Sequence, residues 1–255
     1  MVEVIGVSKA YGPKKVVKGV SLRIQKGKVT TMIGPNGAGK STLLAMMSRL
    51  IPKDGGEVRI DGREIGQYRS GDLAQRLAIL KQTQQMNVRL TVQELVEFGR
   101  FPYSQGRLTQ VDRKLVDQAI AYLDLGAIAG KFLDQLSGGQ RQRAFIAMVL
   151  AQDTEYVFLD EPLNNLDMKQ SVQIMQVLRR LVDELGKTVV LVLHDLNFAS
   201  CYSDVIVALK DGEVVAAGSP EELIRSDVLR SIYEMEIPIE NVHGCRICIY
   251  FNGAV

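Results

Sequence analysis

The sequence predicts an α/β fold with a mainly parallel central sheet. Short apolar runs rich in β-branched residues recur along the chain, and segments with helical spacing separate them. The runs lie at 29–33, 156–159 and 189–193, and the helical segments at 40–50, 141–151 and 168–185. Continuous apolar runs are typical of strands buried on both faces, and their alternation with helices is typical of an α/β protein. The 255 residues are enough to bury a large core.

The beginning of the chain follows a different pattern. Residues 2–24 predict two short antiparallel strands joined by a turn at Gly12 and Pro13. Residues 57–60 predict another strand, which ends in the turn dipeptide Asp61-Gly62. We therefore expect a separate antiparallel β subdomain at the N-terminus.

A mainly helical segment interrupts the α/β alternation. Thr91 is a predicted helix N-cap with Glu94 three residues later, which is the capping-box pattern. We expect the whole chain, 1–255, to form a single domain with a semi-independent helical lobe. Its approximate lobes are a core of 1–82 and 137–255 and the helical lobe of 83–136.

Composition and charge narrow the function classes. Thirty-one basic residues against 29 acidic ones give a net charge of +2, so there is no global electrostatic case for a nucleic-acid partner. Three cysteines do not make a disulfide framework, which favours a reducing, cytosolic compartment. We find neither a secretory-signal pattern nor an apolar run of membrane-spanning length. A membrane is therefore expected to matter only through a partner.

A glycine-rich phosphate-binding loop follows the first apolar run. The eight residues are Gly34, Pro35, Asn36, Gly37, Ala38, Gly39, Lys40 and Ser41, and Thr42 comes next. They fit the pattern G-x-x-x-x-G-K-[ST] between a strand and a helix, where backbone N–H groups and the helix N-terminus converge on a phosphate. Lys40 is expected to reach the β- and γ-phosphates of a nucleotide, and Ser41 to ligate Mg²⁺. The loop alone indicates an NTPase core without choosing a family.

Two acidic residues end the apolar run at 156–159. Asp160 and Glu161 follow it directly, and side chains alternate along a strand, so the two carboxylates point in different directions. Asp160 is expected in the Mg²⁺ shell. Glu161 is expected to act as general base on the attacking water.

The segment Leu136-Ser137-Gly138-Gly139-Gln140 decides the family. This LSGGQ string is the signature of the ABC ATPases, and the resemblance to that family extends over nearly the whole chain. Ser137 and two glycines open a helix whose N-terminus can bind phosphate. The resemblance implies that this second phosphate site works in trans, on the ATP held by a partner copy.

Further elements of the family appear in the expected order. Tyr11 resembles the aromatic residue that stacks on adenine, with a core aromatic as the alternative interpretation. Gln82 resembles the glutamine that contacts Mg²⁺ and water and links the core to the helical lobe. Lys81 stands where the family often has proline, which leaves Gln84 and Gln85 as alternatives.

Two more family positions lie in the second half of the chain. The segment from Asn164 to Asp167 resembles the loop that contacts the partner copy, and Asp167 is its retained acid. His194, after the apolar run at 189–193, resembles the switch histidine that contacts the γ-phosphate. With Glu161 and Gln82, His194 completes the expected catalytic set.

The resemblance also implies partners and a location. Two copies are expected to pair head to tail around two Mg-ATP molecules and to act on transmembrane permease subunits, and indirectly with a substrate-binding protein. The expected location is peripheral, on the cytoplasmic face of the cell membrane. A stand-alone transporter subunit is favoured, because the chain has one cassette and no fused membrane domain.

The cargo is inferred from resemblance alone. Residues 90–103 and 159–167 are similar to the ATPases of ferric-siderophore importers, with the petrobactin or catecholate branch as one possibility. Haem or cobalamin importers remain alternatives, as does a non-transport ABC ATPase. Cys245 and Cys248 form a C-x-x-C beside His243, but the sequence offers no second ligand pair. We therefore interpret 246–251 as a terminal strand.

Overall fold

The computed structural model describes residues 1–81 and 89–250. These residues form two compact units, one of 1–68 with 188–250 and the other of 69–81 with 89–187. We call these the first unit and the second unit. None of the helices in the described ranges is long and apolar enough to cross a membrane.

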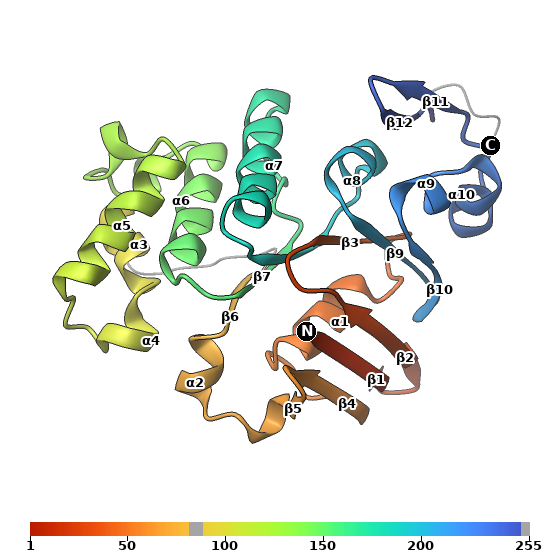
Figure 1. The fold of residues 1–255 in the computed structure, drawn as a ribbon, viewed down its shortest axis with the longest axis horizontal. Helices are drawn as coiled ribbons and strands as arrows, with labels where there is room; N and C mark the ends of the chain where they lie inside the picture. Colours follow the sequence, from red (N-terminus) through yellow and green to blue (C-terminus); the bar gives the residue numbers. More distant parts are fainter. Residues whose placement is uncertain (82–88, 251–255) are drawn as a thin grey trace. The chain divides into compact units, whose positions relative to one another are not determined.

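The first unit contains two sheets and a C-terminal hairpin (Figure 1). The first sheet is antiparallel, with the order β2-β1-β4-β5. The second sheet contains the order β10-β9-β3-β8, and β11 and β12 form the hairpin. The strands are β1 Val2–Tyr11, β2 Lys14–Ile24, β3 Val29–Ile33, β4 Gly55–Ile60, β5 Arg63–Glu64, β8 Thr188–Val192, β9 Val205–Lys210, β10 Glu213–Gly218, β11 Ile239–Val242 and β12 Cys245–Cys248. The helices are α1 Lys40–Met47, α8 Leu196–Tyr202, α9 Pro220–Leu223 and α10 Ser226–Tyr233, with a 3₁₀ turn at Ile65–Gln67.

The loop that follows β3 lies at the carboxyl edge of a buried parallel sheet. All five residues of β3 and of β8 are buried, so both strands are covered on both faces. β3 pairs in parallel with β8 and with β9, and the chain leaves its carboxyl end at Gly34. The N-terminus of α1 begins six residues later, at Lys40. This strand–loop–helix arrangement places backbone N–H groups at the carboxyl edge of the sheet.

The second unit is mainly helical, with one parallel strand pair, β6 and β7. Its helices α3, α5 and α6 pack against one another (Figure 1). The elements are α2 Ser70–Ala74, β6 Leu77–Leu80, α3 Val92–Phe98, α4 Phe101–Ser104, α5 Gln110–Tyr122, α6 Gly138–Ala151, β7 Tyr156–Asp160 and α7 Met168–Asp183, with 3₁₀ turns at Gly126–Ile128 and Leu133–Gln135.

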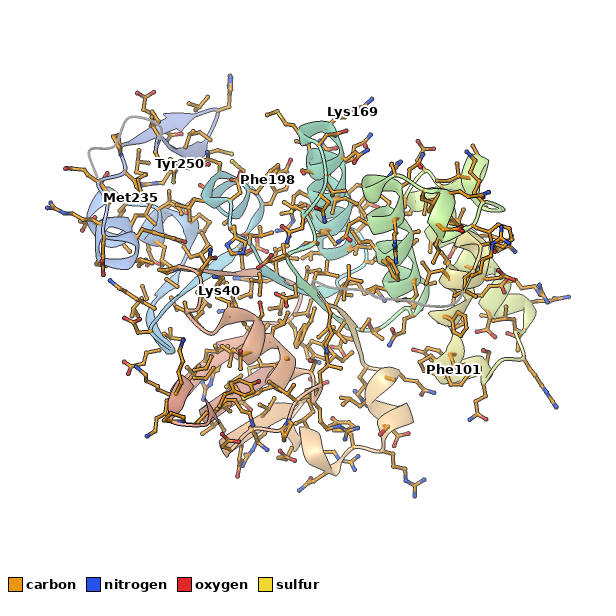
Figure 2. The ribbon with its side chains drawn as sticks, turned by 180° about the vertical axis from the view of Figure 1, so that it is seen from behind. Lys40, Phe101, Lys169, Phe198, Met235 and Tyr250 are labelled. Atoms are coloured by element: carbon orange, nitrogen blue, oxygen red, sulfur yellow. The ribbon has the colours of Figure 1, made fainter. Side chains whose placement is uncertain are left out.

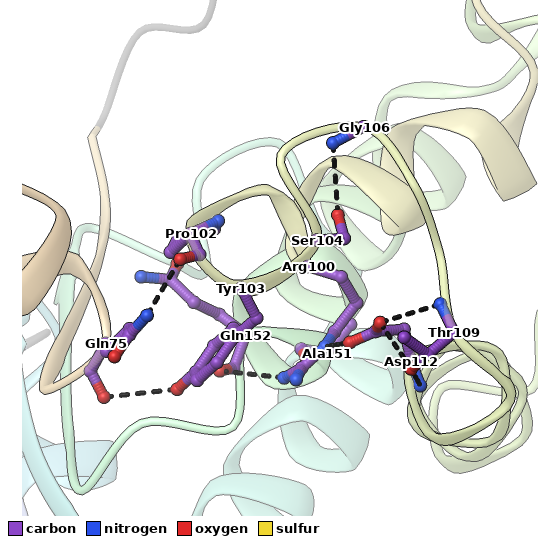
Figure 3. Close-up of polar contacts among 10 residues, drawn as sticks. All are labelled: Gln75, Arg100, Pro102, Tyr103, Ser104, Gly106, Thr109, Asp112, Ala151 and Gln152. Atoms are coloured by element: carbon purple, nitrogen blue, oxygen red, sulfur yellow. Dashed lines mark hydrogen bonds and ion pairs between the residues drawn. The ribbon is translucent and has the colours of Figure 1, made fainter.

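A buried ion pair joins three helices of the second unit (Figure 3). Arg100 Nε donates to Asp112 Oδ1 at 2.8 Å, and both side chains are buried. The Arg100 guanidinium also donates to the Ala151 carbonyl at the end of α6 and lies over the Tyr103 ring of α4. Asp112 in turn accepts from Thr109, the N-cap of α5. One charged network therefore ties α4, α5 and α6 together.

Most sequence predictions of local structure are confirmed. The strand at 29–33, the first hairpin and the turn at Asp61-Gly62 all occur, and Thr91 and Glu94 form a capping box. The mixed α/β fold is confirmed as well. Helix α6 begins at Gly138 rather than at 141, and β12 ends at Cys248 rather than running to 251. The lobe boundaries expected at 82 and 137 stay a prediction.

Candidate functional site

The phosphate loop of the first unit depends on glycine at two positions. Gly34 and Gly39 have φ angles of 140° and 97°, which L-residues rarely adopt. A Cβ at Gly34 would overlap the carbonyl oxygen of Leu209 in β9, and one at Gly39 would crowd the carbonyl of Val16 in β2. The loop is therefore held by close backbone packing against two neighbouring strands.

Lys40 lies at the start of α1 and is buried (Figure 2). Its Nζ donates to the carbonyl oxygens of Gly34 at 2.7 Å and Pro35 at 2.9 Å, so the side chain curls back over its own loop. Gly39 is the N-cap of α1 and, as a glycine, offers no side-chain oxygen to the N–H groups of the first turn. The first turn of α1 carries no acidic side chain that would compete with a bound anion.

The other candidate residues of the first unit lie at element ends. Tyr11 is the last residue of β1 and is 53% exposed, so the alternative that it belongs to the core is wrong. His194 follows β8 and is exposed. The next residue, Asp195, caps α8 by accepting from the backbone N–H groups of Asn197 at 2.8 Å and Phe198 at 3.0 Å. The sequence analysis did not anticipate this cap.

In the second unit, the two candidate carboxylates end β7. Asp160 is the last residue of the strand and Glu161 follows it, and both are buried. Glu161 has a φ angle of 51°, in the left-handed region that a non-glycine residue seldom occupies. Asn164 Nδ2 donates to Glu161 Oε2 at 2.5 Å. The Glu161 carboxylate is therefore oriented by a neighbour, a role for Asn164 that the sequence analysis missed.

The LSGGQ segment forms the N-terminus of α6. Ser137 caps the helix, its Oγ accepting from the Gln140 backbone N–H at 3.3 Å, and Gln140 Oε1 accepts from the Ser137 N–H at 3.1 Å. Ser137 and Gly138 are exposed, whereas Gly139 is buried against the side chain of Gln170 on α7. The serine and the first glycine are thus presented to solvent at a helix N-terminus.

Two remaining predicted residues have different outcomes. Asp167 caps α7, its Oδ1 accepting from the Gln170 N–H at 2.7 Å, so it has a structural use that the sequence analysis did not foresee. Gln82 lies outside the described residues, as do the alternatives Gln84 and Gln85.

All three cysteines of the chain lie in α8 and β12. Burial raises the pKa of Cys201 to about 12 and that of Cys248 to about 11, which makes these thiols poor nucleophiles. No group of three or more potential metal ligands occurs among the residues that the structure describes. Asn197 instead holds the Cys248 backbone, accepting from its N–H at 2.7 Å. The burial of Cys248 and this hydrogen bond favour a packing role for the end of β12.

The fold and the loop from Gly34 to Ser41 define an α/β protein of the phosphate-loop class. A family model described as ABC transporter matches residues 17–164. The chain belongs to the ABC transporter family and is one of its ATP-binding, ATP-hydrolysing proteins.

Individual members of the family are similar to this chain over most of its length. The chain is 63% identical to the petrobactin import ATP-binding protein YclP of Bacillus subtilis (strain 168), covering 99% of this chain and 100% of that protein. It is 49% identical to the petrobactin import ATP-binding protein FatE of Bacillus anthracis, covering 94% and 96%. Among solved structures, a dimeric post-hydrolysis state of the ATP-binding cassette MJ0796 bound to ADP and Pi has 34% identity and a TM-score of 0.78, covering 86% of this chain and 99% of that one.

Proposed function

We propose that this chain is the ATP-hydrolysing subunit of an importer for an iron(III)-siderophore of the petrobactin kind. The observation that carries the cargo class is the 63% identity, over both full lengths, to a petrobactin import ATP-binding protein. The subunit would act peripherally on the cytoplasmic face of the cell membrane, paired with itself and bound to permease subunits. A substrate-binding protein would deliver the cargo to that complex.

The first unit would hold the nucleotide. Backbone N–H groups of 34–39 would surround the β-phosphate, and Lys40 would exchange its carbonyl partners for phosphate oxygens. Ser41 and Thr42 extend this contact at the first turn of α1. Tyr11 is exposed at the end of β1, with the Lys9 ammonium 5.6 Å from the centroid of its ring, and this ring would stack on adenine.

Oxygen ligands suited to Mg²⁺ are present in both units. The Ser41 hydroxyl and the buried Asp160 carboxylate are hard donors of the kind Mg²⁺ prefers, and Gln82 would add an amide oxygen. The ion would neutralise charge on the phosphate oxygens.

The chain carries two half-sites that require a partner copy. One is the phosphate loop, and the other is the exposed N-terminus of α6 with Ser137, Gly138, Gly139 and Gln140. In a head-to-tail pair, Ser137 of each copy would contact the γ-phosphate held by the other, with Asp167 close to the shared interface. ATP would stabilise the closed pair because both copies bind it there.

Hydrolysis would use Glu161, with His194 and Gln82 assisting. Asn164 holds the Glu161 carboxylate at 2.5 Å, so the base is pre-oriented to accept a proton from water. His194 would contact the γ-phosphate from the end of β8. Loss of that phosphate would release the contacts that close the pair, and the helical lobe would pass the motion to the permease.

Uptake measurements in cells test the cargo. Cells carrying Lys40→Ala are expected to lose uptake of iron-loaded petrobactin and to keep uptake of haem and cobalamin. Lys18→Ala is a matched control, because Lys18 is an exposed residue of β2. Loss of haem or cobalamin uptake alone would overturn the siderophore assignment. Unchanged uptake of every cargo, in cells with no second cassette that substitutes, would overturn the iron-import function while leaving the ATPase intact.

A further inference from the structure

Tyr233 is the last residue of α10 and carries a buried hydroxyl. Within the described part of the chain, this oxygen has no hydrogen-bond partner. Native proteins rarely leave a buried polar atom unpaired, and such atoms call for an explanation. The groups around the hydroxyl therefore indicate which partner it could bind.

The surroundings of Tyr233 lead to the first glycine of the phosphate loop. Lys210, at the end of β9, donates to the Ser231 carbonyl at 2.8 Å and to Glu234 Oε1 at 2.7 Å, so the last turn of α10 is fixed to that strand. The preceding residue of β9, Leu209, has its carbonyl against Gly34. Gly34 and Tyr233 thus approach the same end of β9, beside which α10 lies (Figure 1).

The electrostatics of the hydroxyl agree with this geometry. Burial raises the pKa of Tyr233 to about 12, and the nearby backbone N–H of Gly34 acts in the opposite direction. The hydroxyl oxygen therefore lies close to this donor, without making a hydrogen bond in the loop conformation that the structure shows.

We propose that Tyr233 is a positioning residue of the phosphate loop, whose hydroxyl accepts a hydrogen bond from the Gly34 N–H when the loop closes on a nucleotide. The inference rests on the proposed role of residues 34–41 in binding ATP. It makes the C-terminal helix α10 part of the nucleotide site, although no motif marks it.

The proposal predicts effects of opposite sign in Tyr233→Phe. Without nucleotide, the variant should be as stable as the wild type or more stable, because it removes an unpaired buried hydroxyl. With nucleotide it should bind more weakly, since one neutral hydrogen bond contributes about a two- to tenfold change in affinity. A purely structural tyrosine would not show this opposition.

Tyr68→Phe is the matched control. Tyr68 lies in the same unit and is buried, and its hydroxyl already donates to the Ile60 carbonyl at 2.9 Å. Its removal should lower the melting temperature of the free protein and leave nucleotide affinity unchanged. Melting curves of the full chain and calorimetric titration with a non-hydrolysable ATP analogue in Mg²⁺ give both readouts.

The outcomes separate this inference from the proposed function. Weaker binding by Tyr233→Phe without a lower melting temperature supports the inference. Unchanged affinity in that variant, with tight binding by the wild type, overturns the inference alone, and so does a fall in melting temperature like that of Tyr68→Phe. Failure of the wild type to bind the analogue overturns the proposed function and the inference together.

Discussion

At the scale of single residues, Glu161 is more constrained than its place in the sequence suggests. It is buried, its backbone is left-handed, and its carboxylate accepts from Asn164. Pre-orientation of this kind favours proton transfer, because the base need not reorganise when the water attacks.

Glu161→Gln removes the proton acceptor while keeping the shape of the side chain. We expect ATP binding to persist, nucleotide-dependent pairing to accumulate, and turnover to fall by roughly 10²- to 10⁴-fold. Phosphate release and light scattering on a sizing column measure these effects. Glu155→Gln, just before β7, is the control and should keep normal turnover. Turnover close to wild type in Glu161→Gln would remove Glu161 from the role of base.

The candidate site residues that a short motif carries are Lys40, Ser41, Asp160 and Glu161. The structure places them at the start of α1 and at the end of β7, as the local patterns predict, and their roles stay predictions. The hydrogen bond from Asn164 depends on how the chain turns after Glu161, which no local pattern encodes.

At the scale of elements, the second unit depends on the network around Arg100. Two buried charges at the junction of α4, α5 and α6 stabilise it only as a pair, because either one alone would be an uncompensated buried charge. Hydrogen bonds from the Thr109 side chain and backbone, and the Arg100 guanidinium, lower the pKa of Asp112 to about 2.

Asp112→Asn tests this network. We expect a loss of about 3 kcal/mol in the free energy of unfolding at neutral pH, measured by urea titration. Because the folded pKa of Asp112 lies below its unfolded value, this contribution is present above about pH 4 and is lost as the pH falls towards 2. The difference between wild type and variant should shrink over that range. Asp117→Asn, an exposed acid on the same helix, should show no such difference.

Element types followed from the sequence better than element ends did. The apolar runs identified β3 and β7 because both are buried on two faces. Helix α6 begins three residues before its apolar pattern, since the Ser137 capping box stabilises a first turn that contains two glycines of low helix propensity.

At the scale of the whole molecule, head-to-tail pairing makes a quantitative prediction. Lys40→Ala damages one half-site and Ser137→Glu, which places a negative charge against the phosphates, damages the other. Each variant alone should be inactive. Mixed in equal amounts, about half of the pairs combine both variants, and each such pair holds one intact site, so about a quarter of the wild-type ATPase should return. Activity no greater than that of the separate variants would contradict the head-to-tail arrangement.

Contacts between distant parts of the chain were beyond sequence reasoning. Tyr233 and Gly34 are almost 200 residues apart, and only the packing of α10 beside β9 brings them together. The packing of α8 against β12 likewise brings together Cys201 and the C-x-x-C, which are far apart in the sequence.

The backbone at Glu161 has a consequence for protein engineering. A left-handed residue with a side chain costs roughly 1–2 kcal/mol, which glycine would relieve. A design procedure that ranks substitutions by folding stability alone would therefore replace this glutamate with glycine and erase the candidate base. We therefore expect thermostabilised versions of this protein to keep their turnover only when position 161 stays glutamate.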